Sequence, residues 1–185
     1  MSKIKSELQN KEILRLSNLQ SNRITRECIE SALILLMKED KLKNISITDI
    51  VKRAGVSRTA YYRNYKSKED ILQNILKDIV DQIVTSMIKF DPYNNSYEFC
   101  LSMFNKASEY ANKYKILVDR DFTSCIMYEM YKKFQSTEKE YNIWSGYKMC
   151  FWSGALYSIL TKWIMNGMQQ KPEDMARFCC QLISH

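Results

Sequence analysis

Glycine, proline and histidine are scarce in this chain of 185 residues, which contains four glycines, two prolines and one histidine. Turn-rich β folds need frequent glycine and proline, so this scarcity favours long helices and an all-α protein. The single histidine is His185, and none of the six cysteines forms a Cys-x-x-Cys pair. These absences argue against a zinc site, and we expect neither a metal nor a cofactor.

Long hydrophobic runs are also lacking. No segment approaches the roughly 20 apolar residues of a membrane-spanning helix, and the N-terminus has no apolar signal segment. We therefore expect a reduced, cytoplasmic protein without a membrane partner, in which the cysteines serve as small buried apolar residues. The alternative, redox sensing by one cysteine, is not favoured by any spacing.

The chain also lacks the usual components of a catalytic site. It has no cysteine–histidine pair and no glycine-rich phosphate loop, and an enzyme needs an activated nucleophile, an acid–base pair or a metal site. We expect that the protein is not an enzyme. Turnover of a bound ligand would reverse this interpretation.

Positive charge is concentrated in the first half of the chain. Residues 1–90 carry 17 Lys and Arg against 11 Asp and Glu, a net charge of +6, whereas residues 91–185 carry 11 against 10, a net charge of +1. A polyanionic partner for one domain only is the expected consequence.

The segment from Ser46 to Tyr65 predicts two short helices around a sharp turn. Ser46 is a good N-cap, and Asp49 stands three residues later, where it can complete a capping box. Gly55 stands where a helix exits through a left-handed residue, and Ser57 can cap a second helix. Helix, glycine turn and helix form a helix-turn-helix, whose second helix can enter the major groove of DNA.

The second helix of this motif has side chains suited to DNA. Arginine can bind guanine with two hydrogen bonds, and small methyl groups can contact thymine, so we expect Arg58, Thr59, Ala60 and Arg63 at base edges. Hydroxyl, amide and ammonium groups suit phosphate oxygens. We assign that role to Thr48, Tyr62, Asn64 and Lys68 and include the caps Ser46 and Ser57 in the DNA-binding set. The alternative is a solvated surface helix with a basic face.

The residues from Thr25 to Leu72 resemble the DNA-binding region of the TetR family of bacterial transcriptional regulators. The matching segments are Thr25–Leu33, Ile47–Ser57 and Tyr62–Glu69. The resemblance implies a three-helix DNA-binding domain joined to a larger helical domain that dimerises and often binds a small effector. It also implies that Thr25 and Arg26 approach the DNA backbone. Tyr61 stands where the family usually has an apolar residue, so we expect it to be mostly buried.

The predicted domains follow the helical pattern. They are an N-terminal extension (1–21), a helix-turn-helix domain (22–67), a connecting helix (68–90) and a regulatory and dimerisation domain (91–185). The first helix is expected from Asn22 or Arg23 to Lys38. The extension is expected either to be frayed or partly helical, or to be a basic arm that adds phosphate contacts.

Helices are expected throughout the second domain, over 96–114, 115–136 with a break near Asp119–Asp121, 138–167, and from Pro172 onward. Its aromatic and methionine side chains suit either plain core or an effector pocket, because pockets for small molecules are mostly apolar and aromatic. The candidate pocket residues are Phe99, Met103, Phe104, Phe122, Met127, Tyr131, Trp144, Tyr147 and Phe151.

Small side chains among large ones mark a candidate dimer interface. Gly154, Ala155 and Ser158 would let two helices approach closely, and with the last helix they could build a two-fold four-helix interface. The alternative is packing within one chain. The candidate interface residues are Trp152, Gly154, Ala155, Ser158, Ile159, Phe178 and Leu182.

The function most consistent with these patterns is that of a dimeric repressor. It would bind a palindromic operator in double-stranded DNA and be released by a small apolar or aromatic effector. The alternative keeps the DNA but replaces the small molecule with a protein partner, and regulation could then be activation.

Overall fold

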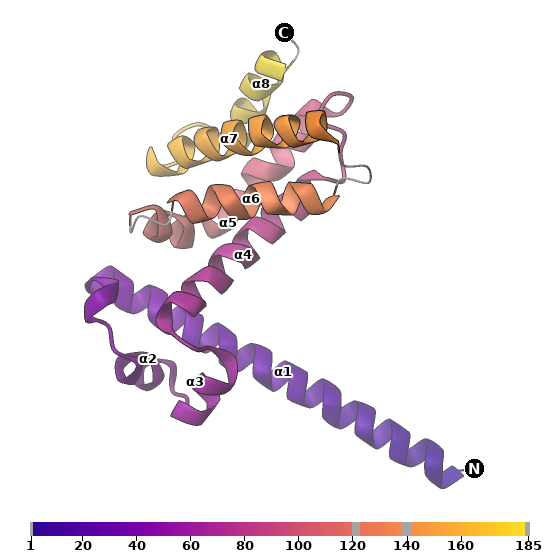
Figure 1. Cartoon of the computed structure of the whole chain (residues 1–185), viewed down its shortest axis with the longest axis vertical. Coiled ribbons are helices and arrows are strands. Elements are labelled where there is room, and N and C mark those ends of the chain that lie inside the picture. Colours follow the sequence, from indigo (N-terminus) through magenta and orange to yellow (C-terminus); the bar gives the residue numbers. More distant parts are fainter. Residues whose placement is uncertain (1, 120–122, 138–141, 184–185) are drawn as a thin grey trace. The chain divides into compact units, whose positions relative to one another are not determined.

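The structure, a computed structural model, describes the backbone of residues 2–119, 123–137 and 142–183, and the side chains from residue 12 onward except 119, 123, 137 and 183 within these ranges. The described residues form helices and turns and include no β-strand, as the sequence predicts (Figure 1). The chain divides into two compact units, Met1–Leu72 and Gln73–His185. The phenylalanine of the predicted pocket at position 122, and Tyr141, lie outside the described residues.

The first unit contains α1 (Ser2–Glu39), the 3-10 turn η1 (Leu42–Asn44), α2 (Ile47–Ala54), α3 (Arg58–Asn64) and the start of α4 (Lys68–Met87). Its core is formed by fully buried apolar and aromatic side chains from all four helices. They include Ile29 and Leu33 of α1, Ile50 of α2, Tyr61 of α3 and Ile71 of α4. The predicted burial of Tyr61 is confirmed.

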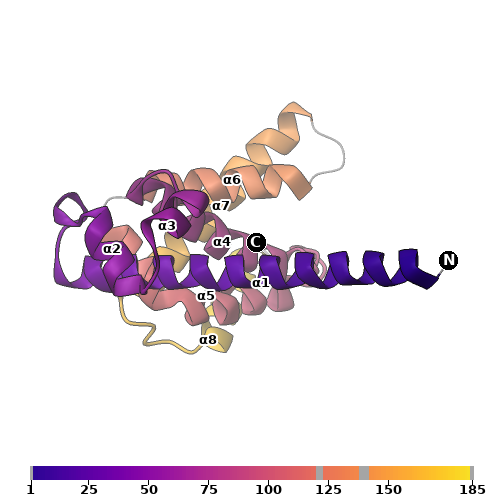
Figure 2. The ribbon, with the colours of Figure 1, turned by 90° about the horizontal axis from the view of Figure 1, so that it is seen from below.

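Helix α1 is much longer than the sequence pattern suggests. The clear helical spacing of apolar residues predicts a start at Asn22 or Arg23, but the helix continues back to Ser2 (Figures 1 and 2). No glycine or proline interrupts residues 2–39, so nothing stops the helix. The Arg23–Glu27 ion pair at 2.9 Å and the bond from Thr25 Oγ1 to the Ser21 carbonyl at 2.8 Å lie on this continuous helix.

The second unit contains the rest of α4, α5 (Ser96–Asp119), α6 (Thr123–Thr137), α7 (Ile143–Met165) and α8 (Pro172–Ile183). The expected division between residues 114 and 115 is wrong. Ala111, Tyr114 and Leu117 are all buried at helical spacing, so one apolar face continues across that point and α5 with it.

The ends of α7 and α8 follow local chemistry. Asn142 caps α7 in a capping box with Ser145, so the helix starts later than the expected residue 138. The left-handed Gly167 follows its last turn, with φ of 76°. Pro172 occupies the first position of α8, where a missing amide hydrogen costs nothing.

Candidate DNA-binding surface

The turn between α2 and α3 has the geometry of a helix-turn-helix. Ser46 Oγ accepts a hydrogen bond from the Asp49 amide at 3.2 Å, and the Asp49 carboxylate accepts one from the Ser46 amide at 2.9 Å. Gly55 leaves α2 with φ of 65° and ψ of 30°, and Val56 N donates to the Val51 carbonyl. The bonds from Ser46, led by that of its hydroxyl, lower the pKa of the Asp49 carboxyl.

Ser57 begins the second helix of the motif by accepting a hydrogen bond from the Ala60 amide at 3.1 Å. Glycine fits the turn because it adopts positive φ without a Cβ clash, and the serine satisfies one of the amides left open at the start of α3. The predicted capping box, glycine exit and second cap are all present. Together they fix the direction in which α3 leaves the turn.

Helix α3 separates a buried face from a polar exposed one. The Tyr61 ring is fully buried, whereas Arg58, Thr59, Tyr62 and Arg63 are exposed. This division places four of the predicted DNA-binding side chains on the solvent side of the helix. On that side they can enter a groove of DNA.

Two of the predicted residues are brought together. Arg58 Nη2 donates to Thr48 Oγ1 at 2.7 Å, which joins the start of α3 to the start of α2. Asn64 Nδ2 instead donates to the Ala60 carbonyl, at 2.8 Å and one turn earlier in α3. Both bonds involve exposed or half-buried side chains, so a DNA ligand could replace them at small cost.

Arg26 lies in a partly buried network that the sequence did not suggest. Its Nε donates to the Tyr65 hydroxyl at 3.3 Å, and its guanidinium lies 5.5 Å from the centre of the Tyr65 ring. That hydroxyl in turn donates to the carboxylate of buried Glu30 at 2.5 Å. Burial, followed by the bond to Glu30, raises the pKa of Tyr65. In this structure Arg26 therefore contributes to holding the end of α3 against α1.

Lys68 also has a different environment from the one expected. Its Nζ donates to the carbonyls of Leu42, Lys43 and Ile45 at 2.6, 3.3 and 2.9 Å. An ammonium group has three donors, so these contacts occupy it and tie α4 to the η1 turn. A bond between Arg53 and both carboxylate oxygens of Glu39 at 2.7 Å similarly ties α2 to the end of α1.

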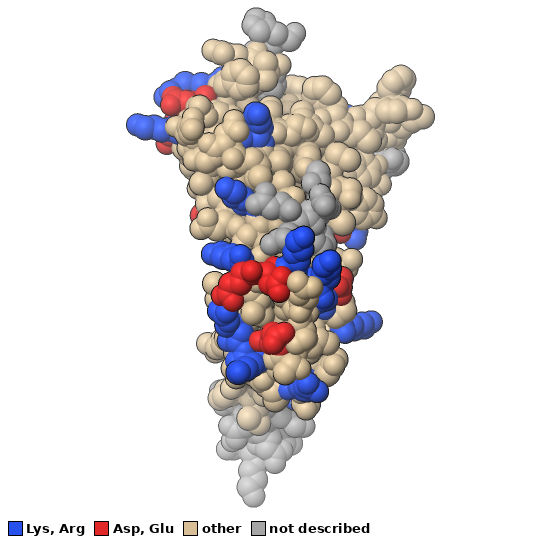
Figure 3. Space-filling view, turned by 90° about the vertical axis from the view of Figure 1, so that its left-hand side faces the viewer, with Lys and Arg blue, Asp and Glu red and all other residues tan. Residues whose placement is uncertain are grey.

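Lysine and arginine are numerous on the first unit. On the face drawn in Figure 3, blue side chains gather over this unit with a few red ones among them, whereas most of the visible surface of the second unit is tan. This agrees with the net charge of +6 over residues 1–90. Lysine and arginine at phosphate contacts release bound counterions from DNA, which makes such a surface attractive to a duplex.

Comparison with known families matches both units. Residues 34–75 match the family model described as bacterial regulatory proteins of the tetR family. Residues 90–185, more than half of the chain, match the model described as a transcriptional regulator C-terminal region. The chain belongs to the TetR family of bacterial transcriptional regulators. Its first unit is the helix-turn-helix DNA-binding domain of that family.

Solved structures of three other proteins, two of them described as TetR regulators, have the same fold. A putative regulator from Syntrophomonas wolfei is 18% identical with a TM-score of 0.67, over 88% of this chain and 94% of its own. A regulator from Streptococcus agalactiae is 17% identical with a TM-score of 0.58, over 91% and 98%. The dihydroxyacetone kinase operon activator DhaS is 16% identical with a TM-score of 0.58, over 86% and 94%. No curated protein sequence is similar to the chain.

The second unit of this TetR-family regulator does not gather the predicted pocket residues. Phe99, Met103 and Phe104 are buried, and Phe104 packs edge-on against Trp163 with ring centres 5.1 Å apart. Several others are exposed on α6 and α7: Met127 at 45%, Trp144 at 76%, Tyr147 at 65% and Phe151 at 68%. Tyr131 is half-buried.

An open pocket of about 420 Å³ lies elsewhere in this unit. Among the described residues that were predicted for the effector pocket, only Phe99 lines it. Trp152, which was predicted for the dimer interface, lines it as well. The Trp152 ring lies 6.1 Å from the rings of both Tyr93 and Phe99, and Lys148 Nζ lies 5.4 Å from the centre of the Tyr93 ring. Sequence periodicity did not reveal this pocket because part of its lining comes from the loop after α4.

The remaining dimer candidates lie on α7 and α8. Gly154, Ala155 and Ile159 are half-buried and Ser158 is exposed, while Phe178 and Leu182 are exposed at 49% and 58%. A Cβ added to Gly154 would meet no heavy atom within 4 Å, so within one chain this glycine faces open space.

The structure describes the chain over residues 2–119, 123–137 and 142–183. In that part no three His, Cys, Asp or Glu side chains cluster in a way that could hold a metal ion. None of its helices combines the length and the apolar character needed to cross a lipid bilayer.

Proposed function

We propose that this TetR-family regulator is a dimeric repressor that binds a palindromic operator and is released from it by a small molecule. The observation that carries the proposal is the capped helix-turn-helix, which holds Arg58, Thr59, Tyr62 and Arg63 on one exposed face. Two such helices related by a two-fold axis, about 34 Å apart, would read successive major grooves of one duplex.

Release would follow from a population shift. DNA favours one spacing of the two recognition helices, and an effector that binds another spacing more tightly weakens the complex by its differential affinity. Helix α4 is the candidate connection, because it begins in the first unit at Lys68 and ends in the second at Met87.

We propose the open pocket near Trp152 as the effector site. Its lining joins aromatic rings from Tyr93, Phe99 and Trp152 to two lysines, Lys89 and Lys148, which outnumber its one acid, Asp91. This combination suits a flat aromatic ligand that carries an acidic group. Binding of a panel of aromatic acids, measured by calorimetry, should weaken strongly in Trp152→Ala. Tyr128→Ala on α6 is a matched control, because Tyr128 is exposed and does not line the pocket.

The experiment that tests the main proposal is selection of bound duplexes from a random DNA library at physiological salt. Enrichment of a palindrome would support a sequence-specific dimer, and its genomic positions would indicate the regulated genes. Binding that depends on salt but not on sequence would contradict the proposal, because specific sites normally bind at least about 10³-fold more tightly than random DNA.

A second candidate is control by a protein partner, with activation as the outcome. The exposed rings of Trp144, Tyr147 and Phe151 on α7 favour it, because exposed aromatic patches are typical of protein interfaces. The similar structure of DhaS is described as an operon activator. A dimer whose DNA affinity does not respond to any small molecule, but changes with a protein, would favour this second candidate.

A further inference from the structure

The N-terminal half of α1 carries none of the assigned DNA-binding residues, and the sequence left open whether it is a basic arm that adds phosphate contacts. The helix extends well beyond α2 and α3 in two perpendicular views (Figures 1 and 2). Its described side chains from residue 12 to residue 24 are all exposed. A helix that projects from a folded domain gains little from burial, so a ligand bound beside it would stabilise it.

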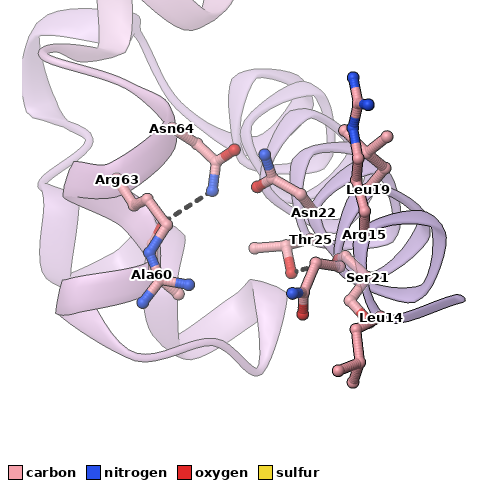
Figure 4. A pocket seen from close by; sticks show the side chains of 10 residues that line it. Leu14, Arg15, Leu19, Ser21, Asn22, Thr25, Ala60, Arg63 and Asn64 are labelled. Atoms are coloured by element: carbon pink, nitrogen blue, oxygen red, sulfur yellow. Dashed lines mark hydrogen bonds between the residues drawn. The ribbon is translucent and has the colours of Figure 1, made fainter. Parts of the chain in front are cut away.

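A groove separates this part of α1 from the recognition helix α3. It has a volume of about 680 Å³ and no acidic residue in its lining. One wall comes from α1 and the other from Ala60, Arg63 and Asn64 of α3. In Figure 4 the side chains of Asn22 and Thr25 point from α1 toward α3. The α1 wall consists of Leu14, Arg15, Asn18, Leu19, Ser21, Asn22 and Thr25.

The α1 wall carries a polar stripe. Arg15, Asn18, Asn22 and Thr25 recur at spacings of three and four residues, which places them on one face of the helix. A helix that packs against protein presents an apolar stripe to its neighbour. The stripe here presents a guanidinium, two amides and a hydroxyl, which are groups that hydrogen-bond phosphate oxygens.

The groove also has unneutralised positive charge on both walls. Among the described residues neither Arg15 nor Arg63 has a carboxylate partner, whereas Arg23 on the same part of α1 pairs with Glu27 at 2.9 Å. Two arginines in the lining of an acid-free groove attract an anion, and Arg58 and Thr59, which are expected at base edges, lie on the same helix as Arg63.

We propose that the sugar–phosphate backbone of one operator strand lies in this groove, held by Arg15 from one wall and by Arg63 from the other, so that Arg63 contacts phosphate instead of the base edge expected from the sequence. The inference rests on the proposed function. Arg15 and Thr25 are roughly 15 Å apart along the helix at about 1.5 Å per residue. Phosphates of one strand repeat at about 3.4 Å along the duplex axis, so the stripe corresponds to about four base pairs of axial length and extends the operator beyond the base pairs that α3 reads.

The test compares Arg15→Ala with Arg23→Ala in the full chain, on the palindrome found by selection. Arg15→Ala should weaken binding to all operator sequences alike and lower the slope of log affinity against log salt by about 1, the effect of one lost phosphate contact. Arg23→Ala is the matched control, because it removes the same charge from the same helix outside the groove. It should leave the slope close to that of the parent.

A length series of the DNA tests the position of the contact. Adding about five base pairs to each end of the palindrome, a length taken from the span of the stripe, should strengthen binding of the parent and of Arg23→Ala but not of Arg15→Ala. If the added base pairs change the affinity of all three proteins equally, the regulator binds DNA but the groove does not hold it. If the parent itself selects no palindrome, the proposed function fails instead.

Discussion

At the scale of single residues, Arg58 is the side chain from which we expect sequence discrimination. It is exposed at the start of α3 and its guanidinium bonds to Thr48 Oγ1 at 2.7 Å. Arg58→Ala should reduce discrimination at one base-pair position by about 1–3 kcal/mol, because a bidentate contact to a base is lost. The measurement is the affinity of parent and variant for every single substitution of the operator.

Arg53→Ala is the control for this prediction. Arg53 lies on α2 and pairs with Glu39, so its loss should affect stability and leave base preference unchanged. If Arg58→Ala keeps the same ranking of operator variants as the parent, Arg58 does not read a base.

Tyr61 carries a buried hydroxyl for which the described structure provides no hydrogen-bond partner. Such a group loses its bonds to water on folding, at a cost of about 1–3 kcal/mol. Tyr61→Phe should therefore raise the free energy of unfolding by about 1 kcal/mol in urea at pH 7. Tyr62→Phe, one residue later and 58% exposed, should change it little. A destabilised Tyr61→Phe protein would show that the hydroxyl has a partner in solution.

The same phenol makes stability depend on alkaline pH. Burial, with smaller contributions from nearby charges, raises the pKa of Tyr61 from 10.0 to about 12. Because the folded state holds the proton more tightly, this contribution is complete below pH 10 and is lost as the pH rises through 12. The parent should lose more stability than Tyr61→Phe between these pH values in urea unfolding.

At the scale of elements, the turn between α2 and α3 depends on one backbone conformation. Gly55 has φ of 65°, and a Cβ added there would meet no heavy atom within 4 Å. The cost of Gly55→Ala is therefore that of the left-handed backbone alone, about 1–2 kcal/mol in the free energy of unfolding. Gly55→Asn should cost less, because asparagine tolerates this conformation. Equal losses for the two variants in thermal or urea unfolding would contradict this explanation.

At the scale of the whole molecule, two substitutions of Gly154 test the stability of the single chain and the proposed dimerisation separately. Within one chain its Cα faces open space in the middle of α7, so Gly154→Ala should stabilise each folded chain by about 0.5–1 kcal/mol. If α7 meets its symmetry mate there, the larger Gly154→Leu should weaken the dimer. The measurements are urea unfolding for Ala and a sedimentation dilution series for Leu.

Ser108→Leu is the control for the dimer measurement. Ser108 is an exposed residue of α5, outside the predicted interface, so the same new side chain there should leave self-association unchanged. A Gly154→Leu protein that dimerises as tightly as the parent would move the interface away from this part of α7.

Local chemistry explains what the sequence by itself determined. The capping box of Ser46 and Asp49, the left-handed Gly55 and the first-turn Pro172 each depend on partners within a few residues along the chain. These local features can therefore be predicted from the sequence, and so can the family that shares this motif. The periodic burial of apolar side chains likewise gave an all-helical fold.

The tertiary structure decided which side chains contact residues distant in the sequence and which are buried by other helices. Arg26 meets Tyr65, and Lys68 meets the carbonyls of Leu42 and Ile45, across separations that no local pattern encodes. Periodicity also marks an apolar face without saying what covers it, so Phe104 in the core and Phe151 at the surface looked alike. Only the packing of the helices separates them, because burial depends on which other elements are near and not on the sequence of one helix.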